Sequence, residues 1–150
     1  MSEIDIVEYL IVGILILISF NDIRHMEVPD SLSFLLIVIG LFNGWYNGNF
    51  ENRVLGMGAY IIPFILIYGY LANLLKKEIL GFGDIKLVMG IGAVVGYRGL
   101  SAIYFFFTNS FVLAGIYCMI KVLIRRKKMK ILLPFAPFLA INAIITMFFL

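Results

Sequence analysis

Charged residues are scarce in this sequence. Only 14% of its 150 residues are Asp, Glu, Lys or Arg, whereas 63% are hydrophobic and the mean hydropathy is +1.05. A soluble domain of this size has too much surface to hide so many apolar side chains. We therefore predict a membrane protein, in which each charged residue near membrane depth needs an explanation.

Cysteine and histidine are almost absent as well. The single cysteine, Cys118, excludes an internal disulfide and any site built from several thiolates, and it is expected to pack as a small apolar residue. The single histidine, His25, excludes the His-Glu-x-x-His helix of zinc proteases. No Gly-x-Ser-x-Gly segment marks a serine nucleophile. We expect no metal and no organic cofactor.

Basic residues are missing from the start of the chain. Glu3, Asp5 and Glu8 precede the first apolar run without any Lys or Arg, so the basic region of a cleavable signal peptide is lacking. Six of the twelve basic residues fall between Lys121 and Lys130, a clustering typical of a loop between membrane spans. This pattern predicts the lipid bilayer as a partner, and not nucleic acid.

Six apolar runs predict an all-α protein with six transmembrane helices in a single membrane-embedded domain, residues 1–150. The runs cover residues 6–20, 32–46, 54–75, 85–97, 100–123 and 131–150. Because a spanning helix needs about 20 residues, the third, fifth and sixth runs are long enough unaided. The other three reach that length only by including polar neighbours, at residues 21–27, 29–31 and 81–84. Those polar ends should line a wet or protein-enclosed cavity.

The distribution of Lys and Arg predicts the orientation, because cytoplasmic loops carry the excess of both. The loops after the first, third and fifth spans, with their flanks, hold ten of the twelve basic residues: Arg24, Lys76, Lys77, Lys86, Lys121, Arg125, Arg126, Lys127, Lys128 and Lys130. The opposite side holds only Arg53 and Arg98. This count predicts that both termini lie outside and that the three odd loops face the cytoplasm.

Asp22 and Asp84 are the informative acidic residues. Asp22 follows the first run and Asp84 opens the fourth, so two complete crossings separate them and both belong to the cytoplasmic side. Taken singly, Asp84 could be a helix N-cap after Gly81 and Gly83, and Asp22 could be an interfacial carboxylate paired with Arg24. Taken together, they could share one proton, as the two carboxylates of an aspartic protease do.

Several neighbouring residues have both a plain and a functional interpretation. Gly81 and Gly83 would leave room for an extended substrate strand beside Asp84. Arg24 and Lys86 each follow an aspartate by two residues, so on a regular helix they should point away from it and extend toward the lipid headgroups. Three further acidic residues could lie at the mouth of such a site or could simply be solvated loop charges: Glu27, Asp30 and Glu78.

Three separated segments carry a resemblance to a known family. They are Asp22-Ile23-Arg24 with Val28-Pro29-Asp30, then Gly81-Phe82-Gly83-Asp84-Ile85-Lys86-Leu87, and then Leu133-Pro134-Phe135-Ala136-Pro137-Phe138-Leu139-Ala140. With these segments the chain resembles the type IV prepilin peptidases, which are intramembrane aspartic proteases of the Gly-x-Gly-Asp type. Each segment alone is weak, but their combination is specific.

The resemblance implies an aspartic endopeptidase that cleaves the short basic leader from type IV prepilins or pilin-like proteins at the cytoplasmic membrane face. It implies Asp22 and Asp84 as the catalytic pair, with Gly81 and Gly83 contacting substrate. Long members of the family carry paired Cys-x-x-Cys motifs associated with methylating the new N-terminus. This sequence has only Cys118, so we expect a peptidase-only form without N-methyltransferase activity.

Two other functions stay open at this point. Two carboxylates near membrane depth could instead bind a cation or relay protons in a small ion-coupled transporter. The lipoprotein signal peptidases are also short aspartic membrane proteases, but that family has four spans and a site on the outer side. The sixth apolar run and the cytoplasmic position of the pair argue against that second alternative.

Overall fold

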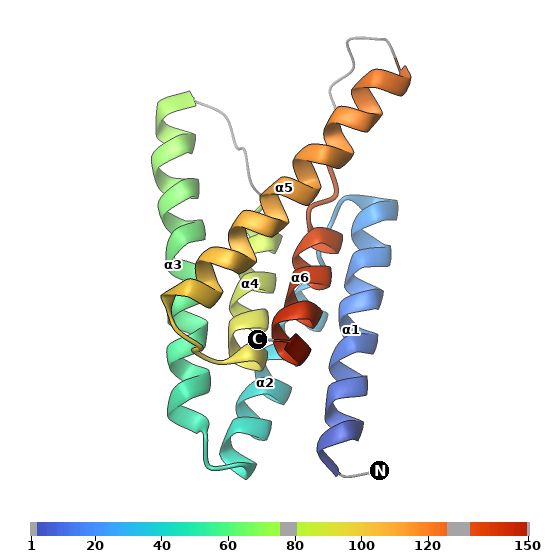
Figure 1. The fold of residues 1–150 in the computed structure, drawn as a ribbon. Helices are drawn as coiled ribbons and strands as arrows, with labels where there is room; N and C mark the ends of the chain where they lie inside the picture. Colours follow the sequence, from blue (N-terminus) through green and yellow to red (C-terminus); the bar gives the residue numbers. More distant parts are fainter. Residues whose placement is uncertain (1–2, 76–80, 126–132, 150) are drawn as a thin grey trace.

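The structure, a computed structural model, describes residues 3–75, 81–125 and 133–149. Six α-helices account for nearly all of these residues, and no strand occurs among them (Figure 1). The helices are α1 (Glu3–His25), α2 (Asp30–Tyr46), α3 (Phe50–Leu75), α4 (Phe82–Val95), α5 (Leu100–Arg125) and α6 (Ala136–Phe149). The prediction of an all-α protein is confirmed.

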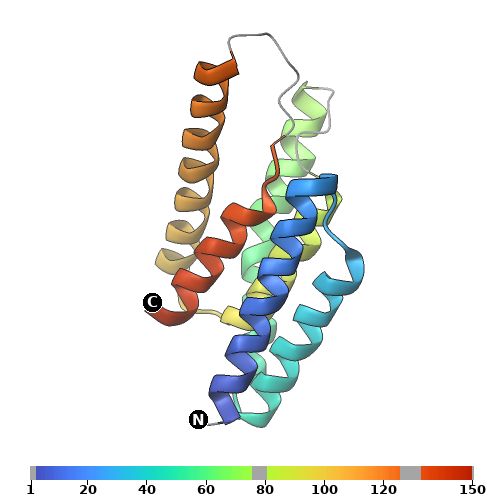
Figure 2. The same ribbon diagram turned by 90° about the vertical axis from the view of Figure 1, so that its right-hand side faces the viewer.

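The helices alternate in direction along the bundle. Figures 1 and 2 show α1, α3 and α5 ending toward the same end of the molecule at which α2, α4 and α6 begin. We call this the upper end, after its place in both views. The chain therefore brings the end of α1 and the start of α4 to one end of the bundle, as counting the crossings between Asp22 and Asp84 requires.

Within the described residues, two helices are long and apolar enough to cross a membrane by length and composition, at Ile6–His25 and Leu100–Ile124. α2 and α6 are shorter apolar helices of 17 and 14 residues. These helices are consistent with a membrane protein, whereas six spans remain a prediction. The polar segments expected to extend the short runs do so in part, since α1 continues to His25 and α4 begins at Phe82.

The last helix is shorter than its apolar run predicts. Residues 131–150 are apolar enough for a full span, but α6 begins only at Ala136 and has 14 residues. Proline explains the late start, because Pro134 has no backbone N–H and its ring would clash with a preceding helical turn. Residues 133–135 are therefore non-helical, and the first turn of α6 lies inside the bundle.

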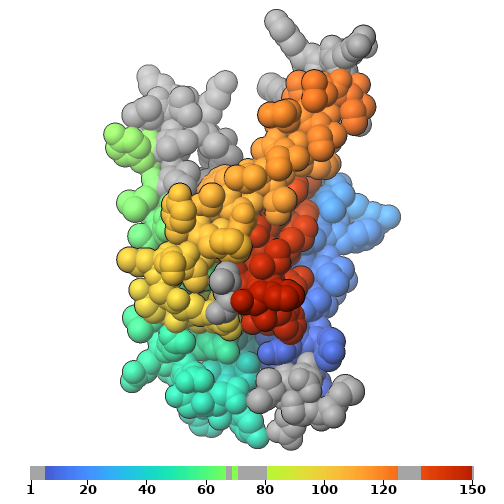
Figure 3. Space-filling model, in the orientation of Figure 1, coloured from blue at the N-terminus to red at the C-terminus, as the bar shows by residue number. Residues whose placement is uncertain are grey.

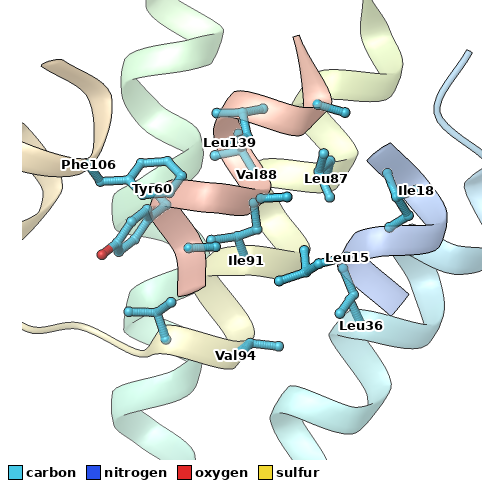
Figure 4. Packing of buried hydrophobic residues seen from close by; sticks show 14 of the residues in the cluster. Leu15, Ile18, Leu36, Tyr60, Leu87, Val88, Ile91, Val94, Phe106 and Leu139 are labelled. Carbon is cyan, nitrogen blue, oxygen red and sulfur yellow. The ribbon is translucent and has the colours of Figure 1, made fainter. Parts of the chain in front are cut away.

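α4 is the central helix. It packs against α2, α3 and α6, and nine of its 14 residues are buried. Figure 4 shows Leu87, Val88, Ile91 and Val94 of α4 surrounded by buried side chains of the other five helices. At about 1.5 Å per residue α4 is roughly 21 Å long, well short of a bilayer core of about 30 Å. Because protein encloses this helix, its polar first turn need not meet lipid.

Glycine allows the close packing of α4 against its neighbours. A Cβ atom on Gly92 would lie 2.6 Å from the carbonyl oxygen of Gly56 on α3, and one on Gly40 of α2 would lie 2.6 Å from the carbonyl carbon of Ala93. Small residues at such contacts are a usual feature of helix packing in membranes. The helix ends at Val95 and is followed by the C-cap residue Gly96, whose φ of 74° is unfavourable for other residues. Backbone contact thus fixes the lower half of α4.

Aromatic side chains attach α5 to the rest of the bundle. The Tyr60 and Phe106 rings have centroids 5.2 Å apart, as do the Phe64 and Phe107 rings. These contacts involve the first half of α5, and Figure 1 shows its second half diverging toward the upper end. In the space-filling view of Figure 3, α5 and α6 form much of the surface on this side. The buried centre is thus closed over on one face by α5 and α6.

Candidate active site

Asp22 lies in the last part of α1 and is buried, with 5% of its surface exposed. Its Oδ2 atom accepts a hydrogen bond of 2.9 Å from the backbone N–H of Ala136, the first residue of α6. Arg24 does not pair with it, since the guanidinium group lies over the Phe20 ring, 4.5 Å from its centroid. The interpretation of Asp22 as half of a surface ion pair with Arg24 is therefore wrong.

Asp84 lies in the first turn of α4 and is half-buried. The N-cap of this helix is Gly81, with extended backbone angles and no side-chain cap bond, so Asp84 is the third helical residue and not the cap. Its backbone N–H donates to the Gly81 carbonyl oxygen at 3.1 Å. The simple N-cap explanation for Asp84 is wrong.

The two aspartates line one cavity at the upper end of the bundle. The cavity has a volume of about 560 Å³, and Asp22 and Asp84 lie near enough for their charges to interact. Its lining comes from the end of α1, the α1–α2 linker and the starts of α2 and α4: Asn21, Asp22, Met26, Glu27, Val28, Pro29, Asp30, Gly81, Phe82, Gly83, Asp84 and Lys86. Four acidic side chains line it, yet no group of three or more potential ligands among the described residues is arranged for a metal ion.

The linker between α1 and α2 forms one wall of this cavity. The Asn21 side chain donates a 2.7 Å hydrogen bond from Nδ2 to the carbonyl oxygen of Glu27, and its Oδ1 atom lies 3.1 Å from Nδ1 of His25. Met26 has a φ of 57°, a conformation that residues other than glycine rarely adopt. The chain thus turns sharply after α1 and passes in front of the first turn of α4.

The two glycines before Asp84 meet different surroundings. A Cβ atom on Gly83 would lie 2.9 Å from the Cβ atom of Val28, so a side chain there would displace the linker. A Cβ atom on Gly81 would have as its nearest neighbour Oδ2 of Asp84, at an ordinary contact distance of 3.6 Å. Gly83 therefore allows the linker to approach α4 closely, whereas Gly81 leaves free the space beside Oδ2 of Asp84 that its own side chain would occupy.

Lys86 behaves differently from its prediction. Its Nζ atom forms an ion pair with Oδ2 of Asp30 at 2.6 Å, and it lies 5.0 Å from the centroid of the Phe82 ring. Lys86 is thus directed across the cavity toward the start of α2 and not toward lipid headgroups. The direction expected from α4 alone is wrong, because the ion-pair partner of Lys86, Asp30, lies on α2.

The charges expected at the cavity mouth are only partly described. Glu27 and Asp30 line the cavity, but Asp30 is engaged by Lys86. Glu78 lies outside the described residues, as do Lys76, Lys77 and most of the basic cluster before residue 131. The orientation deduced from these basic residues therefore stays a prediction.

The contact between Ala136 and Asp22 could not be found from residue types. The donor is a backbone N–H, which every residue except proline carries, and the two residues are 114 positions apart. The sequence indicates only that a helix begins here, because Pro134 and Pro137 lie on either side of Ala136. It does not indicate that this helix start contacts Asp22. The first turn of α6 is therefore a third element of the site, beside α1 and α4.

Two carboxyl groups that line one cavity, one of them on a buried residue, form a pattern that aspartic hydrolases use. Comparison with known proteins identifies one family to which the chain is similar. Residues 9–119 match the Type IV leader peptidase family, and the chain belongs to it. Both Asp22 and Asp84 lie inside the matched region.

Individual relatives agree with this membership. A prepilin leader peptidase/N-methyltransferase of Legionella pneumophila is 34% identical over 143 residues, which is 93% of this chain and 48% of the relative. Proteins of the same description from Pectobacterium carotovorum subsp. carotovorum and Bacillus subtilis are 32% and 28% identical, over 90% and 89% of this chain and 50% and 52% of the relatives. The chain thus spans about half the length of these curated relatives. Among solved structures no match was found.

Proposed function

We propose that this chain is an intramembrane aspartic endopeptidase that removes the short basic leader from type IV prepilins or pilin-like proteins at the cytoplasmic membrane face. The observation that carries the proposal is the meeting of Asp22 and Asp84 in one cavity at the upper end of the bundle. Membership of the leader peptidase family supports the substrate class. No metal or organic cofactor is needed for this chemistry.

The mechanism uses the two carboxyl groups as a pair that holds one proton. The ionised group takes a proton from water while the water oxygen attacks the scissile carbonyl carbon, and the protonated group gives its proton to the carbonyl oxygen. The resulting diol collapses when the C–N bond breaks. The leaving nitrogen takes the proton gained from water, and the other carboxyl group recovers its proton from a diol hydroxyl.

Gly81 and Gly83 are assigned to substrate approach. An extended substrate strand needs space beside Asp84, and a Cβ atom on Gly81 would lie 3.6 Å from Oδ2 of that carboxyl group. Gly83 contributes indirectly, because it lets Val28 and the linker close one wall of the cavity. A cavity of about 560 Å³ can hold only a few residues of a peptide, so the substrate must unwind near the cut.

The proposed topology has six spans, both termini outside and the catalytic cavity facing the cytoplasm. Support comes from the alternating helix directions, which bring the ends of α1, α3 and α5 to the same end of the bundle as the start of α4 (Figures 1 and 2). Labelling of single cysteines in a Cys118→Ser background tests this topology. Lys127→Cys should react only from the cytoplasmic side and Asn49→Cys only from outside, and the reverse pattern would invert it.

The proposed activity of this chain is leader cleavage without methyl transfer. The curated relatives are named for methyl transfer as well as peptidase activity. In the resemblance described above, methyl transfer accompanies paired Cys-x-x-Cys motifs, and this sequence contains only Cys118. The mass of the processed product tests this part, because an added methyl group on the new N-terminus would contradict it.

Reconstitution separates the proposed peptidase from the alternative, an ion- or proton-coupled transporter. The purified protein in liposomes is supplied with a synthetic prepilin that carries its basic leader. We expect cleavage by the wild type and none by Asp22→Asn or Asp84→Asn. Ion flux that depends on these carboxyl groups, without any cleavage, would instead establish the transporter.

A further inference from the structure

The two aspartates differ in what surrounds each carboxyl group. Asp22 faces the N-terminus of another helix, and the bond from Ala136 N–H to its Oδ2 is 2.9 Å long. The preceding residue, Phe135, is also buried, so this donor lies inside the bundle. A backbone N–H can only donate, so it stabilises the ionised carboxylate over the protonated acid. The start of α6 therefore favours a negative charge on Asp22.

The position of Asp22 on its own helix has the opposite effect. It lies in the last turns of α1, where the unpaired backbone carbonyl groups disfavour a nearby negative charge. The N–H groups of α6 counter this effect through direct contact, and direct charge-assisted hydrogen bonds are stronger than the field of a helix end. The ionised state of Asp22 thus depends on α6.

Asp84 receives less support for a negative charge. Among the described residues no backbone N–H of another helix donates to its carboxyl group, and the next turn of α4, at Leu87 and Val88, is fully buried in apolar surroundings. The start of α4 favours a charge on Asp84 through the helix dipole. A negative Asp22 in the same cavity then disfavours a second charge on Asp84.

From this contrast we infer that the backbone N–H of Ala136 acts as a positioning group that keeps Asp22 ionised, so that Asp22 is the general base and the shared proton rests on Asp84. The inference rests on the proposed function for its catalytic meaning, but the location of the proton can be measured without any cleavage. It also gives the segment Pro134-Phe135-Ala136-Pro137 a defined role, in which the prolines fix where the N–H groups of α6 begin.

Other charged groups near Asp22 do not provide the same support. α6 carries no charged side chain between Ala136 and Phe149. The charged or titratable side chains facing the cavity or adjoining Asp22 are Arg24, His25, Glu27, Asp30, Asp84 and Lys86. The two nearest cations on these elements are engaged elsewhere, Arg24 over Phe20 and Lys86 with Asp30. In the described part of the chain, the start of α6 is thus the source of direct donors to Asp22.

Infrared spectroscopy of the purified full chain locates the proton. A protonated carboxyl group gives a C=O band distinct from the carboxylate bands. We expect the wild type to show this band at neutral pH, Asp84→Asn to lose it, and the control Glu51→Gln, which changes an exposed residue at the other end of the bundle, to keep it. Persistence of the band in Asp84→Asn, or its absence from the wild type, would overturn the assignment. Because no substrate is present, a failed peptidase proposal would leave this result intact.

A second comparison tests the role of the Ala136 N–H. Ala136→Pro removes the donor at the first helical position, where proline is otherwise tolerated, and Ala136→Gly retains it. Loss of the donor makes Asp22 easier to protonate, so we expect the acid limb of the cleavage profile to move up by about one pH unit in Ala136→Pro. The acid limb of Ala136→Gly should stay at the wild-type pH. An unmoved limb in Ala136→Pro, whatever rate remains, would contradict the positioning role.

Discussion

A second cavity lies between α1 and α2 nearer the lower end of the bundle, and its lining differs from that of the cavity holding Asp22 and Asp84. Its volume is about 400 Å³, against about 560 Å³ for the upper cavity. Its walls are mostly apolar: Val7, Leu10, Val38, Ile39, Phe42, Asn43 and Tyr46. The upper cavity is lined by four acidic side chains and one lysine.

The comparison shows that a hollow in this bundle is not in itself a reactive site. Both cavities use α1 and α2, so the backbone architecture alone does not distinguish them. The difference arises because the polar end of α1, the α1–α2 linker, the start of α2 and the polar first turn of α4 meet at the upper cavity. Since lipid can occupy an apolar hollow without any cost in unpaired polar groups, the lower cavity needs no reaction to explain it.

The largest effect should come from removing either carboxyl group of the pair. Asp22→Asn and Asp84→Asn should each lower the cleavage rate by at least about 100-fold, because general acid–base catalysis contributes about 10²- to 10⁴-fold. Asp30→Asn is the matched control, since Asp30 lines the same cavity but is exposed and ion-paired. Asp30→Asn should lower the cleavage rate by less than about tenfold. Equal losses in all three variants, measured as rates on reconstituted protein, would remove the distinction between the pair and its neighbours.

A smaller effect is expected at the glycines. Gly83→Ala should destabilise the protein by about 1–3 kcal/mol, because the new methyl group overlaps Val28. Gly81→Ala has room in the folded protein, so it should leave the thermal midpoint nearly unchanged while lowering kcat/KM through crowding beside Asp84. Thermal unfolding in detergent and cleavage kinetics check both variants. If Gly81→Ala retains full kcat/KM, that glycine has no part in substrate approach.

These glycines and their neighbours illustrate what the sequence could and could not predict. The pairing of Asp22 with Asp84 followed from apolar runs and the parity of crossings, which depend only on composition along the chain. The contacts of Lys86 with Asp30 and of Ala136 with Asp22 depend on how different helices pack, and no local pattern encodes them. The length of α6 was overestimated because mean hydropathy does not register the effect of Pro134 on the backbone.

The ion pair across the upper cavity should have a more modest effect. The Lys86 and Asp30 side chains are 36% and 70% exposed, so their pairing should contribute no more than about 1 kcal/mol to stability. Lys86→Asp should reduce cleavage several-fold by repelling Asp30 and shifting the linker. The double variant Asp30→Lys/Lys86→Asp should recover part of that loss. If the exchange restores nothing, the charge of Lys86 acts on something other than Asp30.

The smallest effect should come from the lower cavity. Leu10 is 55% exposed and lies far along α1 from Asp22, so Leu10→Ala should change the cleavage rate by less than about twofold. The measurement is the initial rate of cleavage by reconstituted Leu10→Ala, compared with that of Gly83→Ala. A large loss in Leu10→Ala would mean that the lower cavity takes part in the reaction and that the contrast between the two cavities is mistaken.

The most direct test of the central claim is co-expression of the full chain with a candidate prepilin, followed by N-terminal sequencing of the pilin from membranes. With the wild type we predict a shortened pilin that has lost its basic leader. With Asp84→Asn, present in the membrane at the wild-type level, we predict a pilin that retains the whole leader. Leader removal by the Asp84→Asn variant at the wild-type rate would contradict the assignment of Asp22 and Asp84 as the catalytic pair.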